Sequence, residues 1–156
     1  MKNIFGLTRE DLEKYFLSIG EKKFKATQVF EWLYIHKKWN ISEFSNIKKD
    51  IQNKLSEDFS TDFIKIEIVE EGSLVKKFLF RLLDGEKIEA VLMEHDYGLS
   101  VCVSSQVGCN MGCRFCESGR LKKVRNLEAY EIVEQILLIE KYIGKRIDSV
   151  VMMGIG

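Results

Sequence analysis

Three closely spaced cysteines lie in the last third of the chain. Cys109, Cys113 and Cys116 follow the pattern C-x3-C-x2-C inside a glycine-bearing segment. Iron–sulfur clusters are held by cysteine thiolates, and three such ligands suit three irons of a [4Fe–4S] cube, which leaves the fourth iron open to another ligand. The pattern therefore predicts a loop built around a cluster, and an iron with an open position is a catalytic iron.

Other uses of clustered cysteines fit less well. A zinc site normally takes four ligands in two short pairs that lie far apart in the sequence, and only Cys102 is available here as a fourth ligand. A disulfide framework is disfavoured because the first residues become charged before the apolar core of a secretory signal could develop. Iron–sulfur ligation is the favoured interpretation, with zinc and unliganded thiols as alternatives.

The composition limits the classes of function. The chain has 156 residues, of which 46% are hydrophobic and 31% charged, which is typical of one globular domain or two small ones. Its 24 basic and 24 acidic residues balance, so any binding to RNA must come from local patches. No apolar run reaches the roughly 18 residues of a membrane span, and four cysteines without a secretory signal predict the reducing cytoplasm.

Residues 1–60 predict three helices. Thr8 and Asp11 form a capping signature at the start of the first helix, and Gly20 supplies its end. Further apolar faces with a helical period occur at about 25–38 and 45–58. None of these helices has enough apolar surface to be stable alone, so we expect them to pack as a small three-helix unit.

After residue 63 the hydrophobic period changes from 3.6 to 2, which indicates strands. Ile64, Ile66 and Ile68 are expected to share the buried face of the first strand. The dipeptide Asp84-Gly85 predicts a two-residue hairpin between strands at 74–83 and 86–93.

Residues 99–153 predict a strand, loop, helix, strand unit. The strand at 99–104 leads into the cysteine segment, and the apolar run 147–153 is typical of a buried parallel strand. Between them, Asn126 can cap a long helix that Gly144 ends. Such crossovers are nearly always right-handed, so the cysteine segment is expected at the carboxyl ends of two parallel strands, where α/β enzymes carry their chemistry.

Several segments, spread over nearly the whole chain, share a pattern with one known family. They are the run Cys102–Cys116, Arg125-Asn126-Leu127, Met152–Gly156 and, near the start, Gly6-Leu7, Phe24-Lys25-Ala26, Gln28-Val29-Phe30 and Trp32. Together these segments resemble the RlmN/Cfr family of radical S-adenosylmethionine (SAM) RNA methyltransferases.

The resemblance implies a fold that is α+β and then α/β. Residues 1–60 would form a helical accessory domain that contacts RNA, and residues 61–97 an antiparallel β extension. Residues 98–156 would form the first β-α-β unit of a truncated, TIM-like radical SAM barrel.

The resemblance also implies an activity. Such enzymes methylate C2 of adenine in 23S rRNA, at the peptidyl-transferase centre, and in the anticodon loop of tRNA, through a methyl-cysteine intermediate. The Cfr branch methylates C8 instead, and an alternative of another class is a non-catalytic RNA-binding module with a structural four-cysteine metal site. The corresponding partners are 23S rRNA, tRNA and an electron donor such as flavodoxin or ferredoxin, for a cytoplasmic monomer without membrane contact.

The resemblance assigns cofactor roles to individual residues. The three cysteines of the triplet would ligate the [4Fe–4S] cluster, and SAM would chelate the fourth iron. Phe115 would lie beside the adenine of SAM, the structural alternative being that it only packs the loop. Gly154 and Gly156 would let the backbone approach the cofactor closely.

Two further residues match catalytic positions of the family. Cys102 matches a cysteine that helps to resolve the protein–RNA adduct; without the resemblance it would be taken as a small buried side chain in a strand. Glu89 shares a strand face with Val91 and Met93, matches a family glutamate near the reacting centre and is a candidate for proton handling. Its structural alternative is a charge that protects an edge strand from aggregation.

Basic residues form clusters that could contact RNA phosphates. Such runs are more often solvated faces, but the helical domain of the family helps to hold structured RNA. The candidates are Lys22, Lys23 and Lys25 near the start of the chain, and Lys122, Lys123 and Arg125 after the cysteines.

The sequence departs from the family pattern in three places. The pattern continues into Glu-Pro after Gly156, so we expect the remaining barrel strands and the methyl-carrying cysteine to be missing. Two strands cannot close a barrel, and this polypeptide alone is therefore expected to be inactive. Glu117 stands where a small residue is usual, and Ile155 stands where methionine is common.

Overall fold

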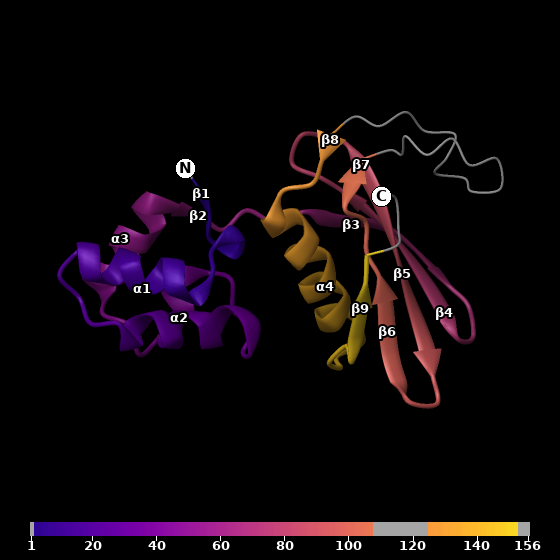
Figure 1. Cartoon of the computed structure of the whole chain (residues 1–156), viewed down its shortest axis with the longest axis horizontal. Coiled ribbons are helices and arrows are strands. Elements are labelled where there is room, and N and C mark those ends of the chain that lie inside the picture. The colour runs from indigo at the N-terminus through magenta and orange to yellow at the C-terminus, as the bar shows by residue number, and fades with distance from the viewer. Residues whose placement is uncertain (1, 108–124, 153–156) are drawn as a thin grey trace. The chain divides into compact units, whose positions relative to one another are not determined.

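The computed structural model describes residues 2–107 and 125–152. The chain is α+β and divides into two compact units, Met1–Asp62 and Phe63–Gly156, each with its own secondary structure (Figure 1). None of the helices in the described ranges combines the length and the apolar surface needed to cross a bilayer.

The first unit is mainly helical. In chain order its elements are β1 (Lys2–Asn3), the 3-10 helix η1 (Ile4–Gly6), α1 (Arg9–Ser18), α2 (Phe24–Tyr34), the 3-10 helix η2 (Ile41–Glu43), α3 (Lys49–Asp58) and β2 (Phe59–Ser60). β1 and β2 pair in parallel, which joins the two ends of the unit.

The three predicted helices are present, and two of them are shorter than expected. At the start of α1, Thr8 Oγ1 accepts a hydrogen bond from the amide of Asp11 (3.1 Å), and the Asp11 carboxylate accepts one from the amide of Thr8 (2.9 Å). α2 ends at Tyr34, shortly before Lys37 takes a left-handed φ of 52° that a helix cannot continue. α3 begins at Lys49, after the separate 3-10 turn at 41–43.

The apolar faces that predict these helices form the core of the first unit. The buried side chains come from all three helices and from both 3-10 turns or their edges. They include Phe5, Leu12, Phe16, Ala26, Val29, Leu33, Ile41, Phe44, Ile51 and Leu55.

The second unit is a five-stranded sheet with a helix against one face (Figure 1). Its elements are β3 (Lys65–Glu71), β4 (Val75–Arg81), β5 (Lys87–His95), β6 (Gly98–Cys102), β7 (Gln106–Val107), β8 (Arg125–Asn126), α4 (Ala129–Ile143) and β9 (Ser149–Val151). The strand order is β3-β4-β5-β6-β9, in which only β6 and β9 are parallel. A parallel connection from β6 through α4 to β9 is therefore present.

The face of the sheet that packs with α4 carries the core of the second unit. Buried side chains from alternate positions of the strands, such as Phe78, Ile88 and Val101, pack there together with Ile139 of α4. Because side chains alternate along a strand, the residues between them, such as Glu89, lie on the opposite face, which we call the open face.

The expected pattern in the first strand is wrong at one position. Ile64 is buried and Ile66 packs against the core, but Ile68 is half exposed. The pairing of β3 with β4 shifts register between Ile66 and Ile68. This bulge reverses the alternation, so Val69 packs against the core in place of Ile68.

The two-residue hairpin expected at Asp84-Gly85 is also wrong. The amide of Leu82 donates to the carbonyl of Glu86 (2.8 Å), and the amide of Gly85 donates to the carbonyl of Leu82 (3.0 Å). Residues 83–85 therefore form a three-residue connection, in which only Gly85 takes a positive φ, of 90°. This is the common three-residue hairpin, a turn followed by a left-handed glycine.

The long helix begins later than expected, and the last strand is less buried. Asn126 does not cap α4, because it pairs with Gln106 in the ladder of β7 and β8; the cap is Glu128. Gly144 ends the helix as predicted, with a left-handed φ of 69°. β9 is parallel to β6, but it lies at the edge of the sheet formed by the described residues, where Val150 is 44% exposed.

Candidate functional site at the base of the cysteine segment

The predicted site residues fall into two groups. Those outside the described residues are Cys109, Cys113, Phe115, Cys116, Glu117, Lys122, Lys123, Gly154, Ile155 and Gly156. Those that the structure places are Lys22, Lys23, Lys25, Glu89, Cys102 and Arg125. Within the described ranges, no group of three or more His, Cys, Asp or Glu side chains is arranged to hold a metal ion.

The residues on either side of the cysteine segment pair with each other. β7 and β8 form a short antiparallel ladder in which Gln106 faces Asn126 and Val107 faces Arg125. Figure 1 shows these two strands side by side where β6 ends. We call β7 and β8 the two stems, because the cysteine triplet lies between them in the sequence.

The stems start at the carboxyl end of the parallel strand pair. Beyond the end of β6, the amide of Val103 donates to the carbonyl of Val151 in β9 (2.9 Å), and β7 follows three residues later. In α/β folds this end of parallel strands is where ligands bind. The structure thus places the base of the cysteine segment at the end of the sheet that usually carries chemistry.

A glutamine of α4 holds the chain just before the first stem. The Gln135 side chain accepts a hydrogen bond from the amide of Ser104 (3.0 Å) and donates one to the carbonyl of Ser104 (3.0 Å). Both residues are fully buried. The Ser104 hydroxyl in turn donates to the backbone carbonyl of Glu89, so the start of the stem is tied to α4 and to β5.

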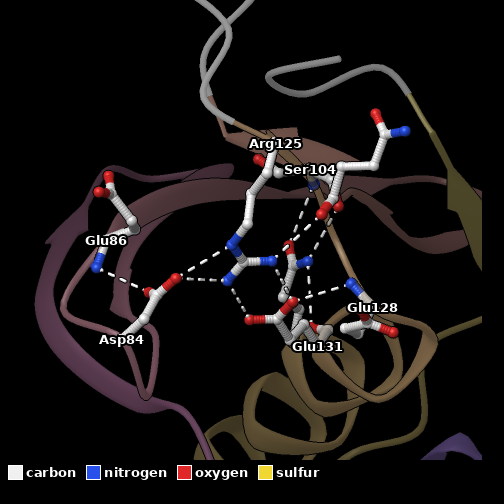
Figure 2. A network of polar contacts seen from close by, with 8 residues as sticks. Asp84, Glu86, Ser104, Arg125, Glu128 and Glu131 are labelled. Carbon is white, nitrogen blue, oxygen red and sulfur yellow. Dashed lines mark hydrogen bonds and ion pairs between the residues drawn. The ribbon is translucent and has the colours of Figure 1, made fainter.

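An arginine holds the second stem (Figure 2). Arg125 donates to both carboxylate oxygens of Glu131 (2.7 and 2.8 Å), and its Nε donates to Asp84 (3.0 Å). A further ion pair joins its second terminal nitrogen to Asp84 (3.0 Å), and its first also donates to the carbonyl of Asn126 (3.1 Å). Four of the five N–H donors of the guanidinium thus donate hydrogen bonds within the protein, so Arg125 is a poor candidate for an RNA phosphate contact.

The charges in this network stabilise each other. The hydrogen bonds from Arg125 to Glu131 raise the pKa of the guanidinium further above its ordinary value. The backbone amide of Glu86 and, to a smaller extent, the side chain of Arg125 lower the pKa of Asp84. Glu131 also accepts from the amide of Glu128 (2.8 Å), so one buried carboxylate joins the stem to the start of α4.

Glu89 and Cys102 both lie on the open face of the sheet. In the register of β5 and β6, Cys102 is opposite Val91, and Glu89 is two residues from Val91 along the same strand. The Glu89 carboxylate forms an ion pair with Lys77 (3.2 Å), with both side chains near 40% exposed. β5 lies between β4 and β6, so the edge-strand explanation for this carboxylate is wrong.

The basic residues near the start of the chain gather at the first turn of α2. Lys22 and Lys23 are exposed, and the Lys25 ammonium lies 5.5 Å from the ring centre of Phe24, which is itself half exposed. That turn has no acidic residue. Positive side chains at the positive end of a helix dipole are unfavourable for the helix, which makes this turn a suitable place for an anion.

Sequence reasoning missed Gln135, Glu131 and Asp84. A signal for the first two was present, because they are polar residues four apart in a helix whose neighbouring positions, Ile132 and Ile136, are apolar. Polar side chains on the buried side of a helix need partners. Asp84 carried no comparable signal, since a hairpin explains an aspartate there.

Comparison with known proteins places these features in a family. Residues 2–60 match the model described as the ribosomal RNA large subunit methyltransferase N-terminal domain, RlmN_N. A probable dual-specificity RNA methyltransferase RlmN from Enterococcus faecalis is 52% identical over 99% of this chain and 45% of that protein. One from Spiroplasma citri is 44% identical over 100% of this chain and 46% of that protein. Residues 2–60 are an RlmN N-terminal domain, and the whole chain is similar to RlmN proteins.

The fold agrees with this assignment. A radical SAM methyltransferase from Sphaerobacter thermophilus superposes with a TM-score of 0.87 at 30% sequence identity, covering 100% of this chain and 47% of that protein. The chain spans less than half the length of these RlmN relatives and of that structure.

Proposed function

We propose that this chain is the N-terminal part of a radical SAM methyltransferase that modifies C2 of adenine in 23S rRNA and in tRNA. The observation that carries the proposal is the position of the stems. They put the ends of the cysteine segment at the carboxyl end of β6, beside β9, in a chain similar throughout to RlmN proteins. The names of these relatives favour C2 over the C8 methylation of the Cfr branch.

The donor chemistry of the triplet fits a cluster. Thiolates are the soft ligands that iron–sulfur clusters take, and Cys109, Cys113 and Cys116 would supply three of them. Phe115, Gly154 and Gly156 would contact SAM. When bound, the reduced cluster and SAM would supply the radical chemistry of the reaction.

The open face of the sheet would carry the protein's own reacting groups. Cys102 in β6 presents a half-buried thiol there, and Glu89 lies on the neighbouring strand β5. The thiol would help to resolve the protein–RNA adduct, and the carboxylate would hold or move a proton. Lys77 lies beside this carboxylate and forms an ion pair with it.

The first turn of α2 would contact RNA. Lys22, Lys23 and Lys25 add their charges to the positive end of the helix dipole, and the half-exposed ring of Phe24 offers a surface on which a base can stack. Lys122 and Lys123 remain candidates for a second contact, whereas Arg125 is already occupied by carboxylates.

The proposal extends to organisation and partners. Residues 1–60 would be the RNA-contacting accessory domain, 61–97 the β extension and 98–156 the first part of the barrel, although the strands of the last two share one sheet. The enzyme would act as a cytoplasmic monomer that takes electrons from flavodoxin or ferredoxin. The 156 residues alone would not methylate RNA.

Anaerobic reconstitution with iron and sulfide tests the cluster. We expect a [4Fe–4S] spectrum that changes on addition of SAM, is lost in Cys113→Ala and is retained in the matched variant Cys102→Ala. Zinc bound stoichiometrically by all four thiols, Cys102 included, would instead support the non-catalytic RNA-binding module. Mass spectrometry of the adenosine modified by the whole enzyme separates C2 from C8.

A further inference from the structure

The two stems pair over too short a ladder to fix their own register. Each contributes two residues, Gln106–Val107 and Arg125–Asn126. Short isolated strand pairs are at best marginally stable in water. A ladder of this length can slip by a residue unless other contacts hold it, and a slip moves every side chain to the other face.

Both stems are held by the same helix, one turn apart. Gln135 of α4 binds the backbone of Ser104 before the first stem, and Glu131 of α4 binds Arg125 in the second stem. Residues four apart lie on the same side of a helix. Gln135 also donates to the backbone carbonyl of Glu131 (3.3 Å), so the two anchors are joined.

The chemistry of each anchor selects one register. The Gln135 amide pairs with the N–H and the C=O of a single residue, Ser104, and a shift of the chain by one residue would reverse the side on which these groups point. The guanidinium of Arg125 binds two carboxylates through a planar fork, which an ammonium on a flexible stem does not reproduce. Glu131 is 1% exposed and Gln135 is fully buried, so neither is replaced easily by water.

We propose that Glu131 and Gln135 are positioning residues that set the spacing and register of the two stems, and that a cluster bound by the segment between the stems would respond to SAM only when these two residues hold them. Asp84 completes the arrangement by tying Arg125 to the β4–β5 hairpin. The part of this proposal that concerns the cluster rests on the proposed function; the part that concerns the stems does not.

Amide hydrogen exchange of the chain without iron tests the stems. Gln135→Leu is expected to raise exchange at residues 104–107 by about tenfold, the effect of losing a buried hydrogen bond, while the amides of β4 stay protected. The matched control is Gln52→Leu in the first unit, where Gln52 also binds two backbone carbonyls, of Phe44 and Ile47. Gln52→Leu should change amide hydrogen exchange only within residues 41–52. Unchanged exchange at 104–107 in Gln135→Leu would overturn the proposal.

The second anchor needs variants that keep the fold. The double variant Arg125→Met/Glu131→Met removes the ion pair without leaving a buried charge, which is often tolerated. It should keep the amides of β4 and α4 protected and raise exchange at 125–128. Arg125→Lys keeps the positive charge but not the fork, and it should raise exchange there as well. If Arg125→Lys behaves as the unsubstituted chain does, the fork is not what sets the register.

Reconstitution of the chain with iron and sulfide distinguishes failure of this proposal from failure of the proposed function on which it rests. Gln135→Leu is expected to retain iron but to lose the change in the electron paramagnetic resonance spectrum that SAM causes, whereas the surface variant Lys141→Gln keeps it. An unchanged SAM response in Gln135→Leu contradicts the positioning role. If the unsubstituted chain shows no cluster, the proposed function fails, and the exchange results still decide whether the anchors hold the stems.

Discussion

Arg125 binds both carboxylate oxygens of Glu131, at 2.7 and 2.8 Å, and the two partners differ sharply in burial. The arginine side chain is 31% exposed, whereas that of the glutamate is 1% exposed. The two halves of the pair are therefore not equivalent, because only one of them reaches water when its partner is removed.

Removing the arginine should lower the free energy of unfolding more than removing the charge of the glutamate does. Arg125→Met leaves a carboxylate buried without its partner, which costs roughly 3–5 kcal/mol. Glu131→Gln leaves a guanidinium that can still reach water and Asp84, at about 1–3 kcal/mol. Both tryptophans, Trp32 and Trp39, lie in the first unit, so hydrogen exchange in β4 and α4 rather than fluorescence should be followed in urea. Equal losses in the two variants would contradict the unequal burial.

The contribution of Asp84 should depend on pH. Its pKa in the folded chain is lowered, first by the amide of Glu86 and then by Arg125. A group with a lowered folded pKa stabilises the fold above its unfolded pKa, and this stabilisation is lost as the pH falls below about 4. Unsubstituted chain should thus be more stable than Asp84→Asn at pH 7, and the difference should shrink towards pH 3. A stability difference between the two chains that grows on acidification would contradict this prediction.

Glu89 should matter for methylation but little for folding. Its ion pair with Lys77 is exposed to solvent, and such pairs contribute about 0.2–1 kcal/mol. In the whole enzyme, Glu89→Gln is expected to reduce RNA methylation by at least about a hundredfold if it handles a proton. Lys77→Gln breaks the same ion pair but keeps the carboxylate, and it should retain most activity. Full activity in Glu89→Gln would remove Glu89 from the reaction.

Gly98 should be far less tolerant of a side chain than Gly20. Both have a positive φ, of 137° and 80°, which strains an alanine by roughly 1–2 kcal/mol. A Cβ on Gly98 would also clash with the Asp148 carboxylate, which accepts a hydrogen bond from the amide of Leu99, whereas nothing lies within 4 Å of a Cβ at Gly20. Thermal unfolding followed by circular dichroism should rank Gly98→Ala well below Gly20→Ala.

A double variant tests whether the clash with Asp148 causes the loss of stability in Gly98→Ala. Adding Asp148→Ala to Gly98→Ala removes the clash, so the double variant should recover part of the lost stability despite losing a hydrogen bond. If the double variant is as unstable as the sum of the two single ones, the close approach is not what Gly98 provides.

Local signals in the sequence were enough for the elements that local contacts determine. Thr8 and Asp11 predicted the start of α1 because the capping interaction joins residues three apart. Gly144 predicted the end of α4 for a similar reason. The family could also be identified, since its motif residues lie in short runs, and the comparisons confirm it.

The features that local sequence signals did not predict depend on contacts between residues far apart in the chain. The bulge after Ile66 and the pairing of Asn126 with Gln106 depend on neighbouring strands, so no window of sequence contains them. The network around Arg125 joins residues 41 apart in the chain. Periodicity placed Asp84 in a hairpin and the polar residues of α4 in a helix, but it does not say that they meet.

The four-residue step between Glu131 and Gln135 has a consequence for how these proteins can vary. Each residue inserted into a helix turns the following side chains by about 100°, so one insertion between the two anchors would point them to different sides of α4. An alignment of relatives should therefore show gaps in surface turns such as 72–74, but none between positions 131 and 135. Substitutions in α4 should therefore be tolerated more easily than insertions or deletions.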